Sequence, residues 1–167
     1  MAKLPNYFFT TAVLGSLSGM RSLSGLALVA YMLSRKPSKR LQDSHLPIKY
    51  IQTRAASHVL AGMAFSELLG DKLPTAPNRI VAPLLAGRFA MGGLTGATLF
   101  KTKGNSVFSG ALLAGACAVA AAYTSFYLRK AATGPGKLSN FTAGFIEDLL
   151  VYSVGAATIW KIKHQKG

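Results

Sequence analysis

The sequence is nearly devoid of cysteine and poor in acidic residues. Cys117 is the only cysteine among 167 residues, which excludes an internal disulfide and any metal cluster built on several thiolates. Charged residues make up 14% of the chain, against about 25% in typical soluble domains, whereas 50% of the residues are hydrophobic. A soluble domain of this length has too much surface for its volume to bury so many apolar side chains. These proportions favour an integral membrane protein.

Signatures of catalysis and of cofactor binding are also missing. The histidines His45, His58 and His164 are scattered and lack the spacing of metal ligands. The sequence contains no nucleophilic serine elbow, Walker loop or dinucleotide fingerprint. We therefore predict neither a metal nor a cofactor, and a membrane enzyme ranks behind other membrane functions.

The charge is strongly one-sided, with 19 basic residues against 5 acidic ones and a net charge of +14. Such an excess fits nucleic-acid binding, cytoplasmic loops of a membrane protein, or contact with anionic lipid headgroups. All basic residues except Arg21 and Arg88 lie outside the apolar runs or at their ends. That distribution is typical of a membrane protein, so we expect the bilayer and its anionic headgroups as partners, and no nucleic acid.

Five apolar segments follow one another along the chain, and they span 7–33, 55–70, 80–100, 106–128 and 138–160. A spanning helix needs about 20 residues, within a range of about 17–25. We therefore predict an all-α fold, in which residues 1–167 form a single polytopic transmembrane bundle of about five apolar segments. The first segment is long enough to cross with a tilt, or to break near Gly19–Arg21 into two pieces.

The basic loop at 34–54 predicts the orientation in the membrane. Its lysines and arginines place it in the cytoplasm and indicate a multi-pass protein of the inner (cytoplasmic) membrane. If the first segment crosses once, the N-terminus lies outside and the C-terminus inside. Arg129, Lys130 and Lys137 then lie outside, against the positive-inside rule. If the first segment enters and returns, the N-terminus moves inside and the rest is unchanged.

A weak internal repeat divides the chain into halves 7–78 and 79–161. In each half, a Gly-rich stretch that carries an arginine is followed by a stretch that carries acid. The matched stretches are 17–26 with 85–94, and 61–69 with 143–150. Chance matching in a Gly-, Ala- and Leu-rich sequence is the competing explanation. Small transporters often carry such repeats, with the site between them.

Small residues recur at helical spacing and predict close helix packing. Gly15 and Gly19 form one G-x-x-x-G pattern, Gly92 and Gly96 form a second, and Gly115 continues the theme in the fourth segment. Because lipid provides little hydrophobic drive between helices, association depends on close backbone approach. These glycines are interpreted as packing residues within one subunit, or alternatively as the face of a homo-oligomer.

Charged residues inside the apolar segments are the candidate functional residues. Arg21 and Arg88 are the available cations, and Glu67, Glu147 and Asp148 are the available anions. A charge at the bilayer centre costs roughly 2.5–3.5 kcal/mol on insertion scales, so each needs a partner or water. Pairing between arginines and acids is therefore expected. The pairs are interpreted as a network that fixes helix register, as a proton or ion pathway, or as a headgroup or substrate site.

The loop after the second segment adds polar candidates. Glu67 and Asp71 are four residues apart and share one helical face. Lys72 and Arg79 flank a proline-containing loop and would hold a phosphate or anchor headgroups. Glu67 is the favoured functional carboxylate, because a carboxylate in apolar surroundings suits proton binding and release.

These residues resemble a known family. The stretch Glu67-Leu-Leu-Gly-Asp-Lys-Leu-Pro-Thr-Ala-Pro-Asn-Arg79 is similar to the DUF 4126 family, and so are the Gly19-Met-Arg21 helix, Pro83-Leu-Leu-Ala-Gly-Arg88 and the Glu147–Asp148 pair. The resemblance implies a bacterial polytopic membrane protein with no assigned activity. It marks, without assigning roles, the positions Arg21, Glu67, Asp71, Lys72, Pro74, Arg79, Arg88, Glu147 and Asp148.

Two functions follow from these patterns. The favoured one is a small transporter or channel for an anion or a proton-coupled solute, which uses the buried arginine and acid pairs. The alternative is a structural or lipid-interacting membrane protein without transport activity, whose buried charges only specify the fold.

Overall fold

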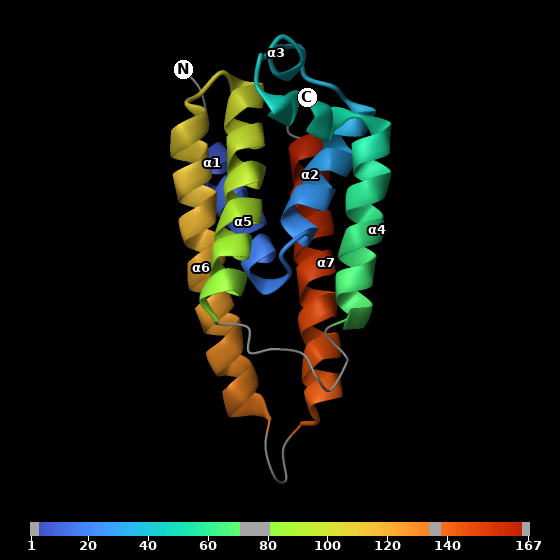
Figure 1. The fold of residues 1–167 in the computed structure, drawn as a ribbon, viewed down its shortest axis with the longest axis vertical. Coiled ribbons are helices and arrows are strands. Elements are labelled where there is room, and N and C mark those ends of the chain that lie inside the picture. Colours follow the sequence, from blue (N-terminus) through green and yellow to red (C-terminus); the bar gives the residue numbers. More distant parts are fainter. Residues whose placement is uncertain (1–3, 71–80, 134–137, 165–167) are drawn as a thin grey trace.

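The structure, a computed structural model, describes residues 4–70, 81–133 and 138–164, and these residues are helical almost throughout, with no strand among them (Figure 1). The all-α prediction is therefore confirmed. The elements in chain order are α1 (Leu4–Met20), α2 (Ser24–Arg35), α3 (Lys39–Gln42), the 3-10 helix η1 (Pro47–Gln52), α4 (Arg54–Gly70), α5 (Ala82–Lys103), α6 (Val107–Ala132) and α7 (Asn140–His164).

The first apolar segment forms a hairpin of two helices. Helix α1 ends at Met20, the chain turns through Arg21, Ser22 and Leu23, and α2 runs back beside α1 (Figure 1). Of the two alternatives that the sequence allows, the structure therefore shows the broken segment. The local sequence explains the break, because its serines and glycines are poor helix formers that compete with the helical backbone bonds.

Gly25 allows the two arms of the hairpin to touch. A Cβ atom at Gly25 would lie 2.3 Å from the carbonyl oxygen of Leu14 and 2.2 Å from the Ser18 hydroxyl. Both distances are far below van der Waals contact, so no larger residue fits. The absence of a side chain at this position lets the start of α2 pack directly on the backbone of α1.

The glycine patterns of α1 and α5 both face α6. A Cβ atom at Gly19 would lie 2.0 Å from the carbonyl oxygen of Ala118, and one at Gly96 would lie 2.0 Å from that of Gly110. Gly15 meets Ala114 in the same way, at 2.6 Å. Three helices therefore approach one another closely through small residues, and the contacts lie within one chain.

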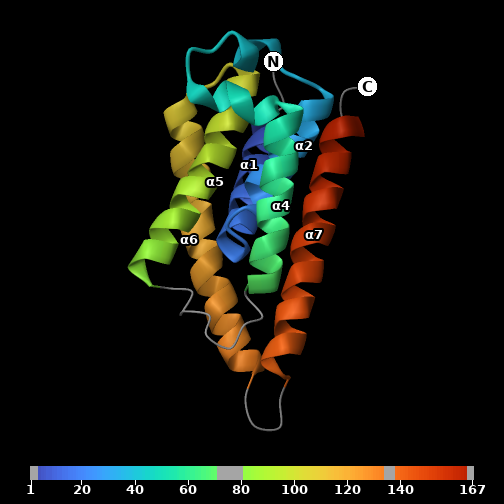
Figure 2. The ribbon, with the colours of Figure 1, turned by 45° about the vertical axis from the view of Figure 1, so that its right-hand side comes forward.

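Gly92 and Gly115 complete this interface. A Cβ atom at Gly92 would lie 2.7 Å from the Ala118 side chain, and one at Gly115 would lie 2.7 Å from the ring of Phe89. Helices α1, α5 and α6 form a tightly packed unit, and α4 and α7 contact the α1–α2 hairpin away from that unit (Figure 2).

Local signals define the turn between α5 and α6. Helix α5 ends at Gly104, whose φ of 79° is the left-handed conformation that glycine adopts at helix C-termini. Helix α6 begins after Ser106, whose hydroxyl accepts a hydrogen bond from the backbone N–H of Ser109 at 3.4 Å. The short connection makes α5 and α6 antiparallel neighbours.

One end of the molecule collects the start of α1, the segment 36–53 and the ends of α5 and α7 (Figures 1 and 2). The rings of Tyr7 and Phe100 are 5.0 Å apart, and Arg40 Nη1 donates to the carbonyl oxygen of Lys103 at 2.6 Å. Leu41 and Ile162 pack in the same apolar cluster. The basic loop and the C-terminal end of α7 therefore lie at the same end of the bundle.

The remaining four apolar segments each form one helix, α4 to α7, within a few residues of the expected bounds. In the described part of the chain, two helices are long and apolar enough to cross a membrane, over Val107–Ala132 and Phe141–Ile162. Large apolar side chains are also exposed on the outer faces of α4, α6 and α7, among them Val59, Phe65, Phe108, Leu128, Phe145, Leu149 and Trp160.

The two halves of the suggested repeat run in opposite directions. Helices α1, α2 and α4 belong to the first half, and α5, α6 and α7, each reversed in direction, belong to the second (Figure 1). The matched stretches nevertheless differ in backbone conformation, because 17–26 contains the helix break whereas 85–94 lies within the unbroken helix α5.

Candidate functional site

The turn between α1 and α2 leaves backbone groups without helical partners, and Glu67 binds those at the start of α2. Its Oε1 accepts a hydrogen bond from the Ser22 N–H at 2.9 Å, and its Oε2 accepts one from the Leu23 N–H at 3.2 Å. The first N–H groups of a helix have no partner within the helix, and a negative charge there is favourable. Glu67, near the end of α4, therefore caps the N-terminus of α2.

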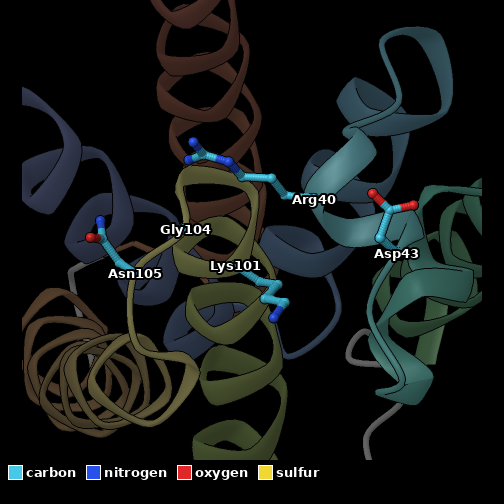
Figure 3. Close-up of a pocket in the computed structure, with 5 residues that line it drawn as sticks. All are labelled: Arg40, Asp43, Lys101, Gly104 and Asn105. Atoms are coloured by element: carbon cyan, nitrogen blue, oxygen red, sulfur yellow. The ribbon is translucent and has the colours of Figure 1, made fainter.

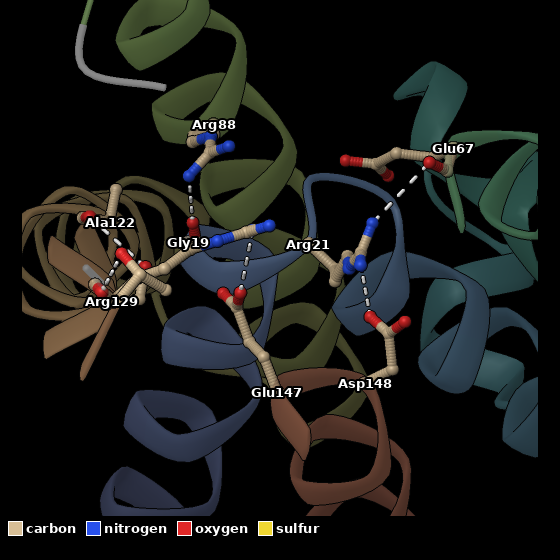
Figure 4. Close-up of polar contacts among 10 residues, drawn as sticks. Gly19, Arg21, Glu67, Arg88, Ala122, Arg129, Glu147 and Asp148 are labelled. Carbon is tan, nitrogen blue, oxygen red and sulfur yellow. Dashed lines mark hydrogen bonds and ion pairs between the residues drawn. The ribbon is translucent and has the colours of Figure 1, made fainter. Parts of the chain in front are cut away.

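Arg88 has the complementary position at the end of α1. Its Nη1 donates to the carbonyl oxygen of Gly19 at 2.6 Å, and the residue is only 5% exposed. The last carbonyls of a helix are also unpaired within it, and a cation is favourable beside them. The two half-helices are thus held at the break by opposite charges, one from α4 and one from α5 (Figure 4).

Arg21 occupies the turn itself and is 2% exposed. Its Nη2 forms an ion pair with Oδ1 of Asp148 on α7, and its Nη1 donates to the carbonyl oxygen of Glu67 at 3.5 Å (Figure 4). Arg21 thereby joins the hairpin to both α4 and α7. Asp148 is also buried, so this ion pair lies in the protein interior.

Glu147 forms a separate ion pair with Arg129, near the end of α6. Their Oε2 and Nη1 atoms are 3.6 Å apart, and the arginine side chain is 22% exposed. Adjacent residues of a helix point about 100° apart, since one turn takes about 3.6 residues. Glu147 and Asp148 consequently reach different partners, on α6 and on the hairpin.

Five of the residues that the sequence singles out therefore lie together around the break: Arg21, Glu67, Arg88, Glu147 and Asp148. The expected pairing of a buried arginine with an acid is found for Arg21 and Asp148. The Asp71–Arg79 loop, with the candidates Asp71, Lys72 and Arg79, lies outside the described residues. The sequence does not single out Arg129 as a site residue, because it lies in the last turn of α6, at the end of an apolar segment rather than inside one. Its contact with Glu147 depends on the packing of α6 against α7, which the sequence alone does not reveal.

The charges of this cluster balance. Arg21, Arg88 and Arg129 are matched by Glu67, Glu147 and Asp148, three cations against three anions among the described residues. The two carboxylates that contact the hairpin differ, however. Both oxygens of Glu67 accept backbone hydrogen bonds, whereas Oδ2 of Asp148 is buried and has no hydrogen-bond partner in the described part of the chain.

A second polar feature lies at the basic end of the molecule. A cleft of about 330 Å³ is lined by Arg40, Asp43, Lys101, Gly104 and Asn105 (Figure 3). A Cβ atom at Gly104 would lie 2.7 Å from Arg40 Nη1, so the glycine leaves space for the arginine beside the end of α5. This cleft is well separated from the hairpin turn along the bundle.

Comparison with protein-family models, with curated proteins and with solved structures finds no match to this chain. The resemblance to the DUF 4126 family therefore stays a prediction. In the described residues, no group of three or more histidines, cysteines, aspartates or glutamates is placed to hold a metal ion.

Proposed function

We propose that the chain is a multi-pass membrane protein in which α4 to α7 cross the bilayer and α1 and α2 form a re-entrant hairpin. Helix α2 has 12 residues, about 18 Å at 1.5 Å per residue, which is too short for a hydrocarbon core of about 30 Å. Helices α5, α6 and α7 have 22, 26 and 25 residues and are long enough. The 17 residues of α4 are at the lower limit.

Backbone that is not helical is tolerated at membrane depth only where protein or water surrounds it. The hairpin turn satisfies this condition, because Glu67, Arg88 and Asp148 surround it and Arg21 is buried. A re-entrant hairpin in this bundle is therefore physically permitted.

The distribution of cations supports a cytoplasmic position for the end that carries α3. Cytoplasmic loops carry an excess of lysine and arginine. The described cations at that end are Arg35, Lys36, Lys39, Arg40, Lys49, Arg54, Lys101, Lys103 and Lys161, whereas the opposite end has Arg129 and Lys130. With the hairpin, the N-terminal end of α1 joins the basic side, so fewer cations oppose the rule than in the five-span arrangement.

Exposed aromatic residues support the same placement. On α7, Phe141 and Trp160 are exposed at opposite ends of the helix. The 19 steps between them correspond to about 28 Å at 1.5 Å per residue, close to the thickness of a hydrocarbon core. Tyrosine and tryptophan favour the two membrane interfaces. Tyr50 is exposed in η1, at the basic end, and Tyr127 is exposed near the C-terminal end of α6, towards the opposite end.

Within that arrangement, transport of an anion or a proton-coupled solute is the proposed activity. The observation that carries it is the meeting of two half-helix ends with the buried Arg21–Asp148 ion pair inside the bundle. Transporters place their sites at interrupted helices near the membrane midplane, where helix ends and ionisable residues bind substrate and coupling ions. The opposite direction of the two halves also fits that class.

A structural or lipid-interacting protein is the second candidate, and two observations favour it. Glu67 and Arg88 both cap helix ends, so these charges stabilise the fold whether or not anything is transported. The cleft beside Arg40 and Lys101 lies at the basic end, where anionic headgroups would meet it.

Reconstitution into sealed liposomes tests the proposed activity. The full chain, with a pH-sensitive dye enclosed, is exposed to a pH gradient combined with an inward gradient of nitrate, chloride or acetate. We expect faster internal acidification than in protein-free liposomes for at least one anion. A matched control, Asp43→Asn, removes an exposed acid at the basic end and should leave the rate unchanged. A folded parent protein that accelerates none of these fluxes would favour the structural candidate.

A further inference from the structure

We infer that the cleft at the basic end binds one phosphate group, through Arg40 of α3 and through Lys101 and Asn105 at the end of α5, and that an acidic phospholipid supplies it. The inference deepens the lipid-interacting candidate and rests on the proposed placement of this end at a membrane surface, but it does not depend on transport. A phosphate bound there would join the segment 36–53 to the turn between α5 and α6.

Arg40 is held in place with donors to spare. Its Nη1 donates to the carbonyl oxygen of Lys103 at 2.6 Å, which is the one hydrogen bond of its side chain in the described part of the chain. A guanidinium carries several N–H donors in a rigid plane, and that geometry suits the oxygens of a phosphate. The contact with Lys103 therefore fixes the orientation of Arg40 and leaves N–H groups for a ligand.

The end of α5 is shaped to admit this guanidinium. Gly104 ends the helix with a φ of 79°, and a Cβ atom there would lie 2.7 Å from Nη1 of Arg40. Asparagine also adopts the left-handed conformation at helix ends, but its side chain would fill this space. The adjoining cleft of about 330 Å³ lies within the range of small-molecule sites, roughly 300–1,000 Å³.

Two further donors line the cleft from the end of α5. Lys101 precedes Gly104 by three residues, so it lies on the same face of the helix one turn earlier. The Lys101 ammonium and the Asn105 side-chain amide have no hydrogen bond or ion pair among the residues that the structure describes. Lysine binds phosphate as a point charge on a flexible stem, so its ammonium can adjust to a ligand that Arg40 orients.

Asp43 also lines the cleft but is not part of the proposed site. Figure 3 shows the Arg40 side chain extending away from Asp43 and over the end of α5. Asp43 is the one acid at the basic end in the described ranges, whereas lysines surround the cleft on both sides, among them Lys39, Lys49 and Lys103. The surroundings therefore attract an anion to the cleft.

The neighbouring side chains favour a lipid as the source of the phosphate. Leu46 and Tyr50, which belong to the segment 36–53, are 41% and 62% exposed, and the Lys49 ammonium lies 5.4 Å from the centre of the Tyr50 ring. Exposed aromatic side chains beside lysines are typical of a membrane interface, where anionic headgroups attract basic segments. A headgroup phosphate would therefore lie at the level of the segment that carries Arg40.

Thermal unfolding of the purified full chain in a neutral detergent is the direct test. Phosphatidylglycerol, or phosphatidylcholine with the same acyl chains, is titrated into the micelles, and only the first has a headgroup with net negative charge. The response is the difference in melting temperature between the two lipids. We expect phosphatidylglycerol to raise the melting temperature of the parent by about 3–6 °C at about tenfold its dissociation constant. Arg40→Gln and Lys101→Gln should each lose most of this response.

Lys39→Gln is the matched control, because it removes the same charge from the exposed residue beside Arg40, which does not line the cleft. It should keep the response of the parent. Equal losses in Lys39→Gln and Lys101→Gln would show a general attraction of the basic end and would overturn the site. Arg40→Gln also loses the contact with Lys103 and could be destabilised for that reason alone. Lys101→Gln has no such contact to lose, so a full response in this variant would overturn the inference.

Inorganic phosphate distinguishes a soluble source from a lipid one. Sodium phosphate is compared with sodium chloride at equal ionic strength, without added lipid. A response to phosphatidylglycerol alone supports the lipid source. A response to inorganic phosphate alone, lost in Lys101→Gln and kept in Lys39→Gln, would support the phosphate site and overturn the lipid source. A parent protein that responds to neither would overturn the whole inference.

Flux in liposomes of phosphatidylcholine separates this inference from the proposed transport. Flux by a parent protein that phosphatidylglycerol does not stabilise would support transport and overturn the lipid site. Stabilisation that is lost in Lys101→Gln and kept in Lys39→Gln, without flux under any of the gradients, would support the lipid site and overturn transport.

Discussion

Glu147 and Asp148 are neighbours in sequence but pair with arginines on different sides of α7. Glu147 pairs with Arg129 of α6, and Asp148 pairs with Arg21 in the hairpin turn. The two acids therefore connect α7 to two separate parts of the bundle. Helix α7 cannot rotate about its axis without breaking one of these pairs, so the acidic pair fixes its orientation beside the hairpin.

Loss of the Glu67 charge should destabilise the hairpin. Glu67→Gln keeps the shape of the side chain but retains one acceptor oxygen in place of two and removes the anion at the start of α2. Loss of a helix cap of this kind costs about 1–2 kcal/mol. The melting temperature of the purified protein in detergent should therefore fall, whereas Asp43→Asn, at an exposed position, should not change it. An unchanged melting temperature in Glu67→Gln would contradict the capping role.

Two glycines of α5 should respond differently to replacement by alanine, because one lies against α6 and the other does not. Gly96→Ala places a methyl group 2.0 Å from the carbonyl oxygen of Gly110 and should separate α5 from α6. Overpacking of this kind typically costs about 1–3 kcal/mol. In the same helix, a Cβ atom at Gly87 meets nothing within 4 Å, so Gly87→Ala should be neutral or should stabilise by a few tenths of a kcal/mol through its helix propensity. Thermal unfolding of both variants in detergent provides the comparison, and equal effects would argue against the α5–α6 contact.

Most of the fold could be predicted from the sequence because apolar runs of helical length leave few alternatives. The four later segments match α4 to α7, and the glycine patterns lie where helices approach closely. The first segment could not be settled from composition alone. Its outcome depends on the contact of Gly25 with Leu14 and on caps from Glu67 and Arg88, which are distant in sequence.

The candidate site was only partly predictable for a related reason. Charged residues within apolar runs are conspicuous in the sequence, so Arg21 and Asp148 were found as candidates. Which groups these residues contact depends on how the helices are arranged in space. The Gly19 carbonyl and the Ser22 N–H, which contact Arg88 and Glu67, are backbone groups, and nothing in the sequence identifies them as partners of distant side chains. The preference for Glu67 over Asp148 as the functional carboxylate likewise could not be judged without the hydrogen bonds of each oxygen.

The hairpin predicts which side of the membrane each loop reaches. With Cys117 replaced by alanine, single cysteines are introduced at the exposed positions His45, Asn105 and Ser139, and an epitope tag is added at the N-terminus. We expect an impermeant thiol reagent added to intact cells to label Ser139→Cys alone, because His45 lies between α3 and η1 and Asn105 follows α5, both at the basic end. The tag should be protected from external antibody. External access to the tag, with His45→Cys still protected, would show that the first segment crosses the membrane and would contradict the re-entrant arrangement.

The two ion pairs should differ greatly in the cost of breaking them. Arg129 is 22% exposed and can turn towards solvent or headgroups, so Arg129→Gln should cost about 0–1 kcal/mol. Arg21 and Asp148 are both buried, and removal of one partner leaves a charge without compensation, so Arg21→Gln should cost about 3–5 kcal/mol.

The double variant separates this explanation from a simple loss of packing. Arg21→Gln combined with Asp148→Asn removes both charges and allows an amide–amide contact in their place. If uncompensated charge causes the damage, the double variant should be more stable than Arg21→Gln alone, although it contains one more substitution. The stability of the parent, the two single variants Arg21→Gln and Asp148→Asn, and the double variant is measured as the fraction of protein that stays monodisperse during heating in detergent. Additive losses in the double variant would show that the two side chains contribute independently, and the buried ion pair would then not be what joins α7 to the hairpin.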